Sequence, residues 1–145
     1  RCSQIDIDRY FGRLKGPLLD RIDIQVEIPH VSYDDLSRLA DGDPSSVIRE
    51  RVNNARKVQL ARYESEGITS NAQLTAPMLD KYCRLGEAEN KLLQTAFDRL
   101  GLSARAHSKI LKVARTIADL DGSEDIKAPH IAEAIQYRNL DRKGF

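Results

Sequence analysis

Only one segment of this chain alternates apolar and polar residues with the period of a β-strand. Its apolar positions are Ile22, Ile24, Val26 and Ile28, and Pro29 ends the run. A single strand cannot pair its own backbone N–H and C=O groups, and no later segment has the pattern of a partner strand. The sequence therefore predicts a mainly α fold preceded by one strand that needs a sheet from elsewhere.

The chain turns helical from Ser32, where Ser32 and Asp35 resemble a short capping box, and longer helical patterns fill it from residue 43 onward. The first is long: Asp43 is expected as its N-cap and Pro44 as its first residue, and it runs to about Glu64. One face is expected to be buried, and the opposite face is strongly charged. The inner face consists of Val47, Ile48, Val52, Ala55, Gln59 and Tyr63.

Four shorter helices are predicted in the C-terminal half. Thr75 caps the first, and the second spans residues 87–100 with Gly101 as its C-cap. Ser103 caps the third, and Pro129 starts the fourth. The loops between these helices are short, which predicts a compact helical bundle.

Composition limits the kinds of protein that this chain can be. The formal net charge is +1 over 145 residues, so bulk charge indicates neither a nucleic-acid nor a membrane partner. No apolar run approaches the roughly 18 residues of a membrane span, and no signal peptide is present. Cys2 and Cys83 follow no zinc or redox spacing, which predicts a cytoplasmic protein with no metal in this chain.

Arg21 stands where an apolar pair, Leu18 and Leu19, meets the predicted strand. A guanidinium fixed at such a boundary can reach the phosphate of a neighbouring subunit, because it is planar, permanently charged and bidentate toward phosphoryl oxygens. Such an arginine finger contributes ~10³ to 10⁵ in rate in NTPases. On local sequence alone, a surface salt bridge with Asp20 or Asp23 is the simpler interpretation.

A basic face follows on the helix that Ser103 is expected to cap. Arg105 lies in the first turn, against the helix dipole, where backbone N–H groups favour anions. Lys109 and Lys112 share its face at spacings i+4 and i+7, and Arg115 lies near it. This face can bind nucleic-acid phosphates, although it lacks aromatic residues for base stacking. A solvated face of an amphipathic helix is the simpler alternative.

No nucleotide- or metal-binding motif accompanies these basic residues. None of the eight glycines is followed by lysine, so G-x-x-x-x-G-K-[ST] is absent, and so is G-x-G-x-x-G. The three histidines show no metal spacing, and the acidic loop from Asp119 does not match an EF-hand. The chain begins at Arg1 and its only methionine is Met78. We therefore expect it to be the back part of a larger nucleotide-driven protein.

Four motifs together resemble one family, in the same order and over essentially the whole chain. They are Gly16-Pro17-Leu18-Leu19-Asp20-Arg21-Ile22-Asp23, Leu100-Gly101-Leu102-Ser103-Ala104-Arg105, the run from Ile110 to Leu120 and the run from His130 to Arg138. By these motifs the chain is similar to the magnesium-chelatase-related AAA+ ATPases of the YifB/ComM type.

The resemblance implies a division into three parts. Residues 1–30 are expected to be the last helix and strand of an α/β ATPase core, residues 31–74 a connecting helical segment, and residues 75–145 a helical lid. Arg21 matches the arginine finger, which reaches the γ-phosphate held by the adjacent subunit. Arg105 matches the sensor-2 arginine, which contacts the nucleotide of its own subunit.

The resemblance also implies the activity of a longer protein. It is expected to be a ring-forming, hexameric ATPase that uses ATP and Mg²⁺ and remodels DNA. This chain alone is not expected to hydrolyse ATP or hold a cofactor, because it lacks the phosphate-cradling loop and the magnesium-binding carboxylate. Two alternatives stay open: a non-enzymatic DNA-binding module that uses Lys109, Lys112 and Arg115, and a chelatase-type subunit acting in metal insertion.

Overall fold

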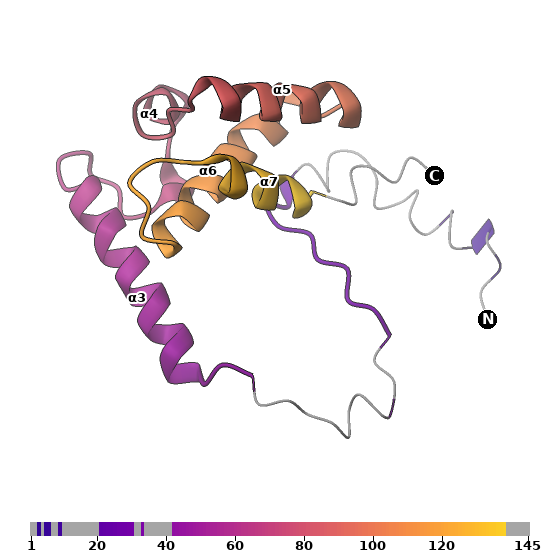
Figure 1. Ribbon diagram of the computed structural model, residues 1–145, viewed down its shortest axis with the longest axis horizontal. Helices are drawn as coiled ribbons and strands as arrows, with labels where there is room; N and C mark the ends of the chain where they lie inside the picture. Colours follow the sequence, from indigo (N-terminus) through magenta and orange to yellow (C-terminus); the bar gives the residue numbers. More distant parts are fainter. Residues whose placement is uncertain are drawn as a thin grey trace.

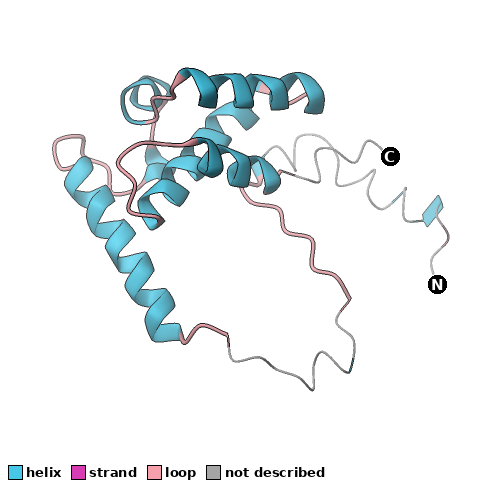
Figure 2. Ribbon diagram, viewed as in Figure 1, coloured by secondary structure: helices cyan, strands magenta, loops and turns pink. Residues whose placement is uncertain are grey.

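The computed structural model describes residues 21–30 and 42–138, together with residues 3, 5, 6, 9 and 33. Within these residues the regular secondary structure is helical, and none lies in a β-strand (Figures 1 and 2). The mainly α fold is therefore confirmed. Of the helix expected before residue 20, only residues 5, 6 and 9 are described, and all three are helical. The elements are α3 (Ser45–Arg62), the 3₁₀ turn η2 (Asn71–Gln73), α4 (Ala76–Tyr82), α5 (Glu87–Leu100), α6 (Ala104–Leu120) and α7 (Ala128–Gln136).

Helix α6 is the central element of the bundle. Helices α7, α3 and α4 and the turn η2 all contact α6, and α5 packs against α7. The buried face of α6 carries Ala106, Ala114 and Ala118, which have no exposed surface. Such small residues let neighbouring helices approach closely, and Ile110 and Ile131 fill the space around them. Other core residues are Tyr63, Leu74, Leu79, Cys83, Leu93, Leu102, Leu111, Ile126 and Ala134.

The ends of the bundle helices follow the predicted capping residues. Gly101 ends α5 in the left-handed conformation with φ 59°, and Ser103 is the N-cap of α6. The Oγ of Ser103 accepts a hydrogen bond from the backbone N–H of Ala106 at 3.2 Å. Helix α7 begins one residue before Pro129, as its position predicts. None of the helices within residues 42–138 has the length and apolarity needed to cross a membrane.

The start of α3 differs from the expectation. Pro44, not Asp43, is its N-cap residue, and the carbonyl oxygen of Pro44 accepts the N–H of Ile48. The carboxylate of Asp43 instead forms an ion pair of 2.5 Å with Arg51, which lies within α3. Asp43 therefore bonds Arg51, eight residues away, and does not cap the first turn of α3.

The inner face of α3 is only half buried. Ala55 and Gln59 are 3% exposed, whereas Val47, Ile48 and Val52 are between 44% and 47% exposed. Figure 1 shows the reason: the N-terminal half of α3 projects beyond the bundle, so no other described helix covers it. The prediction of one continuous buried face is correct only for the C-terminal half of the helix.

The expected half-buried strand is an extended segment in the described part of the chain. Ile24, Val26 and Ile28 are 51%, 64% and 81% exposed. Gln25, which alternates with them, is buried, and its N–H donates to the carbonyl oxygen of Tyr137 at 2.8 Å. The apolar face stays largely exposed because, among residues 21–30 and 42–138, no strand lies beside it.

Candidate anion-binding site

Arg21 and Arg105 line the same open pocket, although they lie far apart in the sequence. The pocket has a volume of about 390 Å³, and among the described residues Ser108, Lys109 and Lys112 of α6 also line it. Within residues 21–30 and 42–138, its lining carries four cationic side chains, one hydroxyl and no carboxylate. Such a set of donors favours an anionic ligand with several oxygen atoms.

Both arginines of the pocket are exposed. Within residues 21–30 and 42–138, neither forms an ion pair with a carboxylate. Asp23, one of the two partners considered for Arg21, pairs with Lys109 instead. Asp20, the other partner considered, lies outside the described residues. Among the described carboxylates, none competes with a ligand for the two guanidinium groups.

The start of α6 sets the position of Arg105. The Ser103 cap fixes the first turn, and Arg105 is the second residue of the helix. A cation here lies near the positive end of the helix dipole, which is unfavourable without a ligand. An anion in the pocket interacts favourably with both the guanidinium and the helix end.

Lys109 links the two segments that carry the arginines. Its ammonium donates to the carbonyl oxygen of Arg21 at 2.6 Å and pairs with the carboxylate of Asp23. Arg138, just after α7, donates from Nη1 to the carbonyl oxygen of Ile22 at 2.6 Å. The backbone next to Arg21 is thus attached to α6 and to the end of α7.

Lys112 lines the pocket and also has a structural contact. Its ammonium donates to the carbonyl oxygen of Ala72 at 2.9 Å and so ties the turn η2 to α6. Lys109 and Lys112 each use part of their hydrogen-bonding capacity on backbone oxygens, which leaves fewer N–H groups for a ligand.

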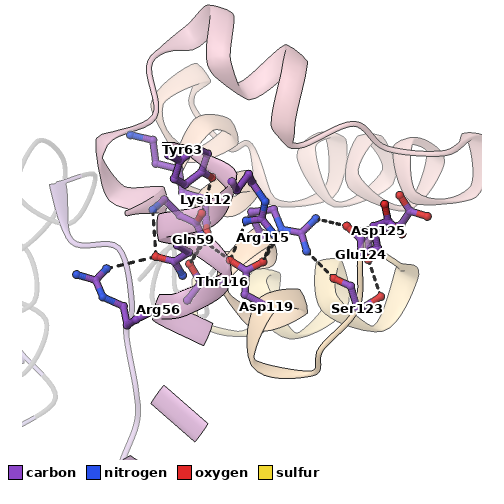
Figure 3. Close-up of polar contacts among 12 residues, drawn as sticks. Arg56, Gln59, Tyr63, Lys112, Arg115, Thr116, Asp119, Ser123, Glu124 and Asp125 are labelled. Carbon is purple, nitrogen blue, oxygen red and sulfur yellow. Dashed lines mark hydrogen bonds and ion pairs between the residues drawn. The ribbon is translucent and has the colours of Figure 1, made fainter. Parts of the chain in front are cut away.

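Arg115 does not share this surface. It is 3% exposed, and its guanidinium bonds the carboxylate of Asp119 and the carbonyl oxygens of Ser123 and Glu124 (Figure 3). The three distances are 3.1, 2.7 and 2.7 Å. Arg115 therefore fastens the loop after α6 and is not available to a nucleic-acid backbone in this conformation.

A buried polar cluster surrounds Asp119, whose side chain has no exposed surface. Two nitrogens of Arg62 donate to its carboxylate at 3.0 and 2.5 Å, and Asn71 donates at 2.8 Å. Burial opposes the charge of Arg62 and is the largest single influence on it, but the interactions with Asp119 and Tyr63 together exceed burial and raise the pKa of Arg62. Only the i, i+4 spacing of Arg115 and Asp119 hinted at this cluster in the sequence, because Arg62 and Asn71 come from distant segments.

His130 and Cys83, two other titratable side chains among the described residues, are both buried in the bundle. The ring of buried His130 accepts the N–H of Lys127 at 3.0 Å and lies 3.2 Å from the carboxylate of Asp121. Burial raises the pKa of the Cys83 thiol to about 11. Within the described ranges, no group of His, Cys, Asp and Glu is arranged to hold a metal ion.

Two family descriptions match successive parts of the chain. The family described as "Magnesium chelatase, subunit ChlI C-terminal" matches residues 42–138, which contain the bundle and Arg105. The family described as "Magnesium chelatase, subunit ChlI" matches residues 1–36, which contain Arg21. The pocket therefore combines one arginine from each of the two matched regions.

Curated relatives match over nearly the whole chain. "Competence protein ComM" of Haemophilus influenzae is 41% identical over 143 residues, which is 98% of this chain and 27% of that protein. "Uncharacterized protein YifB" of Escherichia coli is 40% identical, and YifB of Salmonella typhimurium is 39% identical, each over 98% of this chain and 28% of theirs. The chain thus spans little more than a quarter of the length of these relatives.

Proposed function

Because the chain belongs to the magnesium chelatase subunit ChlI family, we propose that it forms the helical lid and the arginine-finger end of an ATPase. In this proposal α4 to α7 are the lid, Arg21 is the arginine finger and Arg105 is the sensor-2 arginine. The supporting observation is the shared pocket, where two exposed arginines without a carboxylate partner in the described residues face one space.

The chemistry of the pocket fits a polyphosphate. Negative charge spreads over the phosphoryl oxygens as a phosphate is transferred, and a guanidinium aimed at them stabilises that charge. Arg21 supplies such a group from the extended segment, and Arg105 supplies a second from the first turn of α6. The described residues of the lining include no carboxylate, so we propose that Mg²⁺ is held by other parts of the longer protein.

The shared pocket favours a different assignment of the two arginines to the nucleotides of the ring. The family resemblance implies that Arg21 serves the adjacent subunit and Arg105 its own subunit. Two side chains that line one pocket are more simply directed at one nucleotide. We therefore propose that both arginines act on the nucleotide held by the adjacent subunit.

The wider activity concerns the longer protein. We propose a ring-forming, hexameric, cytoplasmic ATPase that uses ATP and Mg²⁺ and remodels DNA. The family match and the similarity to "Competence protein ComM" support the ATPase lid, and the DNA role rests on the resemblance of the sequence motifs. The alternative DNA-binding module has less support, because Arg115 is buried and Lys109 and Lys112 contact backbone oxygens.

ATP hydrolysis by the full-length protein tests this proposal. Arg21→Ala should lower turnover by ~10³-fold or more while ATP still binds, because an arginine finger acts mainly on the transition state. Arg105→Ala should weaken nucleotide affinity or turnover, and Arg49→Ala on the exposed outer face of α3 is a matched control. Wild-type turnover in Arg21→Ala would refute the finger assignment. Salt-sensitive DNA binding by this chain without ATP, lost on charge reversal at Lys109 and Lys112, would instead favour the DNA-binding module.

A further inference from the structure

The segment that carries Arg21 has little burial to hold it in place. Residues 22–30 contain neither helix nor strand, and Ile24 and Val26 are more than half exposed. An extended segment of this kind samples many conformations unless specific contacts restrain it. The position of Arg21 therefore depends on the contacts of the backbone around it.

Lys109 makes the first of these contacts. Its ammonium bonds the carbonyl oxygen of Arg21 at 2.6 Å and the carboxylate of Asp23. The side chain of Lys109 is 22% exposed, so water competes only partly for these bonds. Since Lys109 is one helical turn beyond Arg105 on the same face, it attaches the Arg21 backbone directly beside Arg105.

Arg138 and its neighbour Tyr137 make the second set of contacts. Nη1 of Arg138 donates to the carbonyl oxygen of Ile22 at 2.6 Å, and Arg138 is 1% exposed. The carbonyl oxygen of Tyr137 accepts the N–H of Gln25 at 2.8 Å. Charge-assisted hydrogen bonds are stronger than neutral ones, and burial protects them from water. The segment is thus fixed on both sides of Asp23, to α6 and to the end of α7.

We propose that Lys109 and Arg138 are positioning residues that attach the Arg21 segment to the bundle, so that Arg21 and Arg105 move as one unit. The consequence for catalysis rests on the function proposed above, whereas the attachment itself does not. A reorientation of α6 then carries both guanidinium groups toward or away from the phosphates together. Lys109 acts through the backbone of Arg21 and the carboxylate of Asp23, and not as a phosphate ligand.

Hydrogen exchange on the 145-residue chain tests the attachment without any nucleotide. Lys109→Met and Arg138→Met should each speed exchange of the Gln25 amide by about tenfold or more, because its N–H bonds the carbonyl oxygen of Tyr137 only while the segment is attached, and α6 should stay protected. Lys91→Met, at an exposed lysine of α5, is the matched control and should leave the segment unchanged. Unchanged exchange of the Gln25 amide in both variants would overturn the proposal. If Arg138→Met unfolds the chain, Lys109→Met alone decides.

Asp23→Asn separates positioning from direct phosphate binding. If Lys109 positions Arg21 through Asp23, then Asp23→Asn and Lys109→Met both speed exchange, and the double variant is little worse than either. If Lys109 is a phosphate ligand, Asp23→Asn frees the Lys109 ammonium for the phosphate. ATP binding should then become stronger or stay unchanged, and amide exchange should not change. The second pattern would refute the role assigned to Lys109.

Turnover of the full-length protein tests the consequence for catalysis. Lys109→Met should lower kcat by about tenfold or more with little change in KM for ATP, because Arg21 acts on the transition state. Lys109→Arg keeps the charge and the donors and should restore part of kcat. In an Arg21→Ala background, Lys109→Met should have no further effect. A loss of kcat in that background as large as the loss in the wild-type protein would overturn the positioning role. Wild-type turnover of Arg21→Ala alone would refute the proposed function, but it would not affect the exchange result.

Discussion

Arg62 and Asp119 form two hydrogen bonds, of 3.0 and 2.5 Å, across 57 residues of sequence. Arg62 ends α3 and Asp119 lies near the end of α6, so this pair joins the projecting helix to the centre of the bundle. Asp119 also accepts a bond from Arg115 and has no exposed surface. A single carboxylate therefore balances two guanidinium groups.

Asp119→Asn should be strongly destabilising. The amide keeps the shape of the side chain but removes the negative charge, which leaves Arg62 and Arg115 without their shared counter-charge. Removal of one partner from a buried ion pair costs ~3 to 5 kcal/mol. Urea unfolding of the 145-residue chain measures the loss.

The exposed pair Arg51–Asp43 is the matched control for this prediction. Its separation is also 2.5 Å, but its side chains are 55% and 57% exposed. Asp43→Asn should therefore cost only ~0 to 1 kcal/mol. Similar losses from Asp43→Asn and Asp119→Asn would show that burial does not govern the strength of the two pairs.

Gly101→Ala should lower the stability of the chain by about 1 kcal/mol, because its φ of 59° is strained for a residue with a Cβ atom. An added Cβ would meet no atom within 4 Å, so the loss comes from the backbone and not from a clash. Gly42→Ala has equal space and no positive φ. It should leave the midpoint of thermal unfolding unchanged, and a larger loss at Gly42 than at Gly101 would contradict this account.

Cys83 should resist alkylation in the folded chain. The thiolate is the reactive form, and burial raises the pKa of this thiol from 9.0 to about 11. Because the folded pKa is raised, the neutral thiol stabilises the fold fully below pH 9.0, and this contribution falls as the pH rises through 11. In a Cys2→Ser background, iodoacetamide should label Cys83 only after denaturation. Rapid labelling of the folded chain at about pH 8 would contradict the burial of this side chain.

Much of the bundle could be predicted from local signals. Ser103, Gly101 and Pro129 mark helix ends through chemistry that acts within a few residues, so their roles follow from sequence spacing. The extent of burial on α3 could not be predicted in this way. Ile48 and Ala55 belong to the same apolar face, but Ala55 is 3% exposed, whereas Ile48 is 46% exposed and lines an open pocket.

The candidate site was predicted residue by residue but not as a whole. Spacing along α6 placed Arg105, Lys109 and Lys112 on one face, and all three line the pocket. No local signal could show that Arg21 joins them, because its position depends on contacts with α6 and the end of α7. Spacing likewise could not show that Arg115 turns to the Asp119 cluster, since its carbonyl partners come from the loop after α6.

The central claim is that Arg21 and Arg105 of one subunit act on the same nucleotide, the one held by the adjacent subunit. Mixed rings test this claim most directly. Full-length subunits with Arg21→Ala are mixed with equal amounts of subunits with Arg105→Ala, and ATP turnover is measured. If both arginines act on the adjacent subunit's nucleotide, every interface lacks one of them, and the mixture stays as inactive as its components. If Arg105 instead serves its own subunit, about one interface in four regains both arginines, and turnover recovers to about a quarter of the wild-type value. That recovery would contradict the claim.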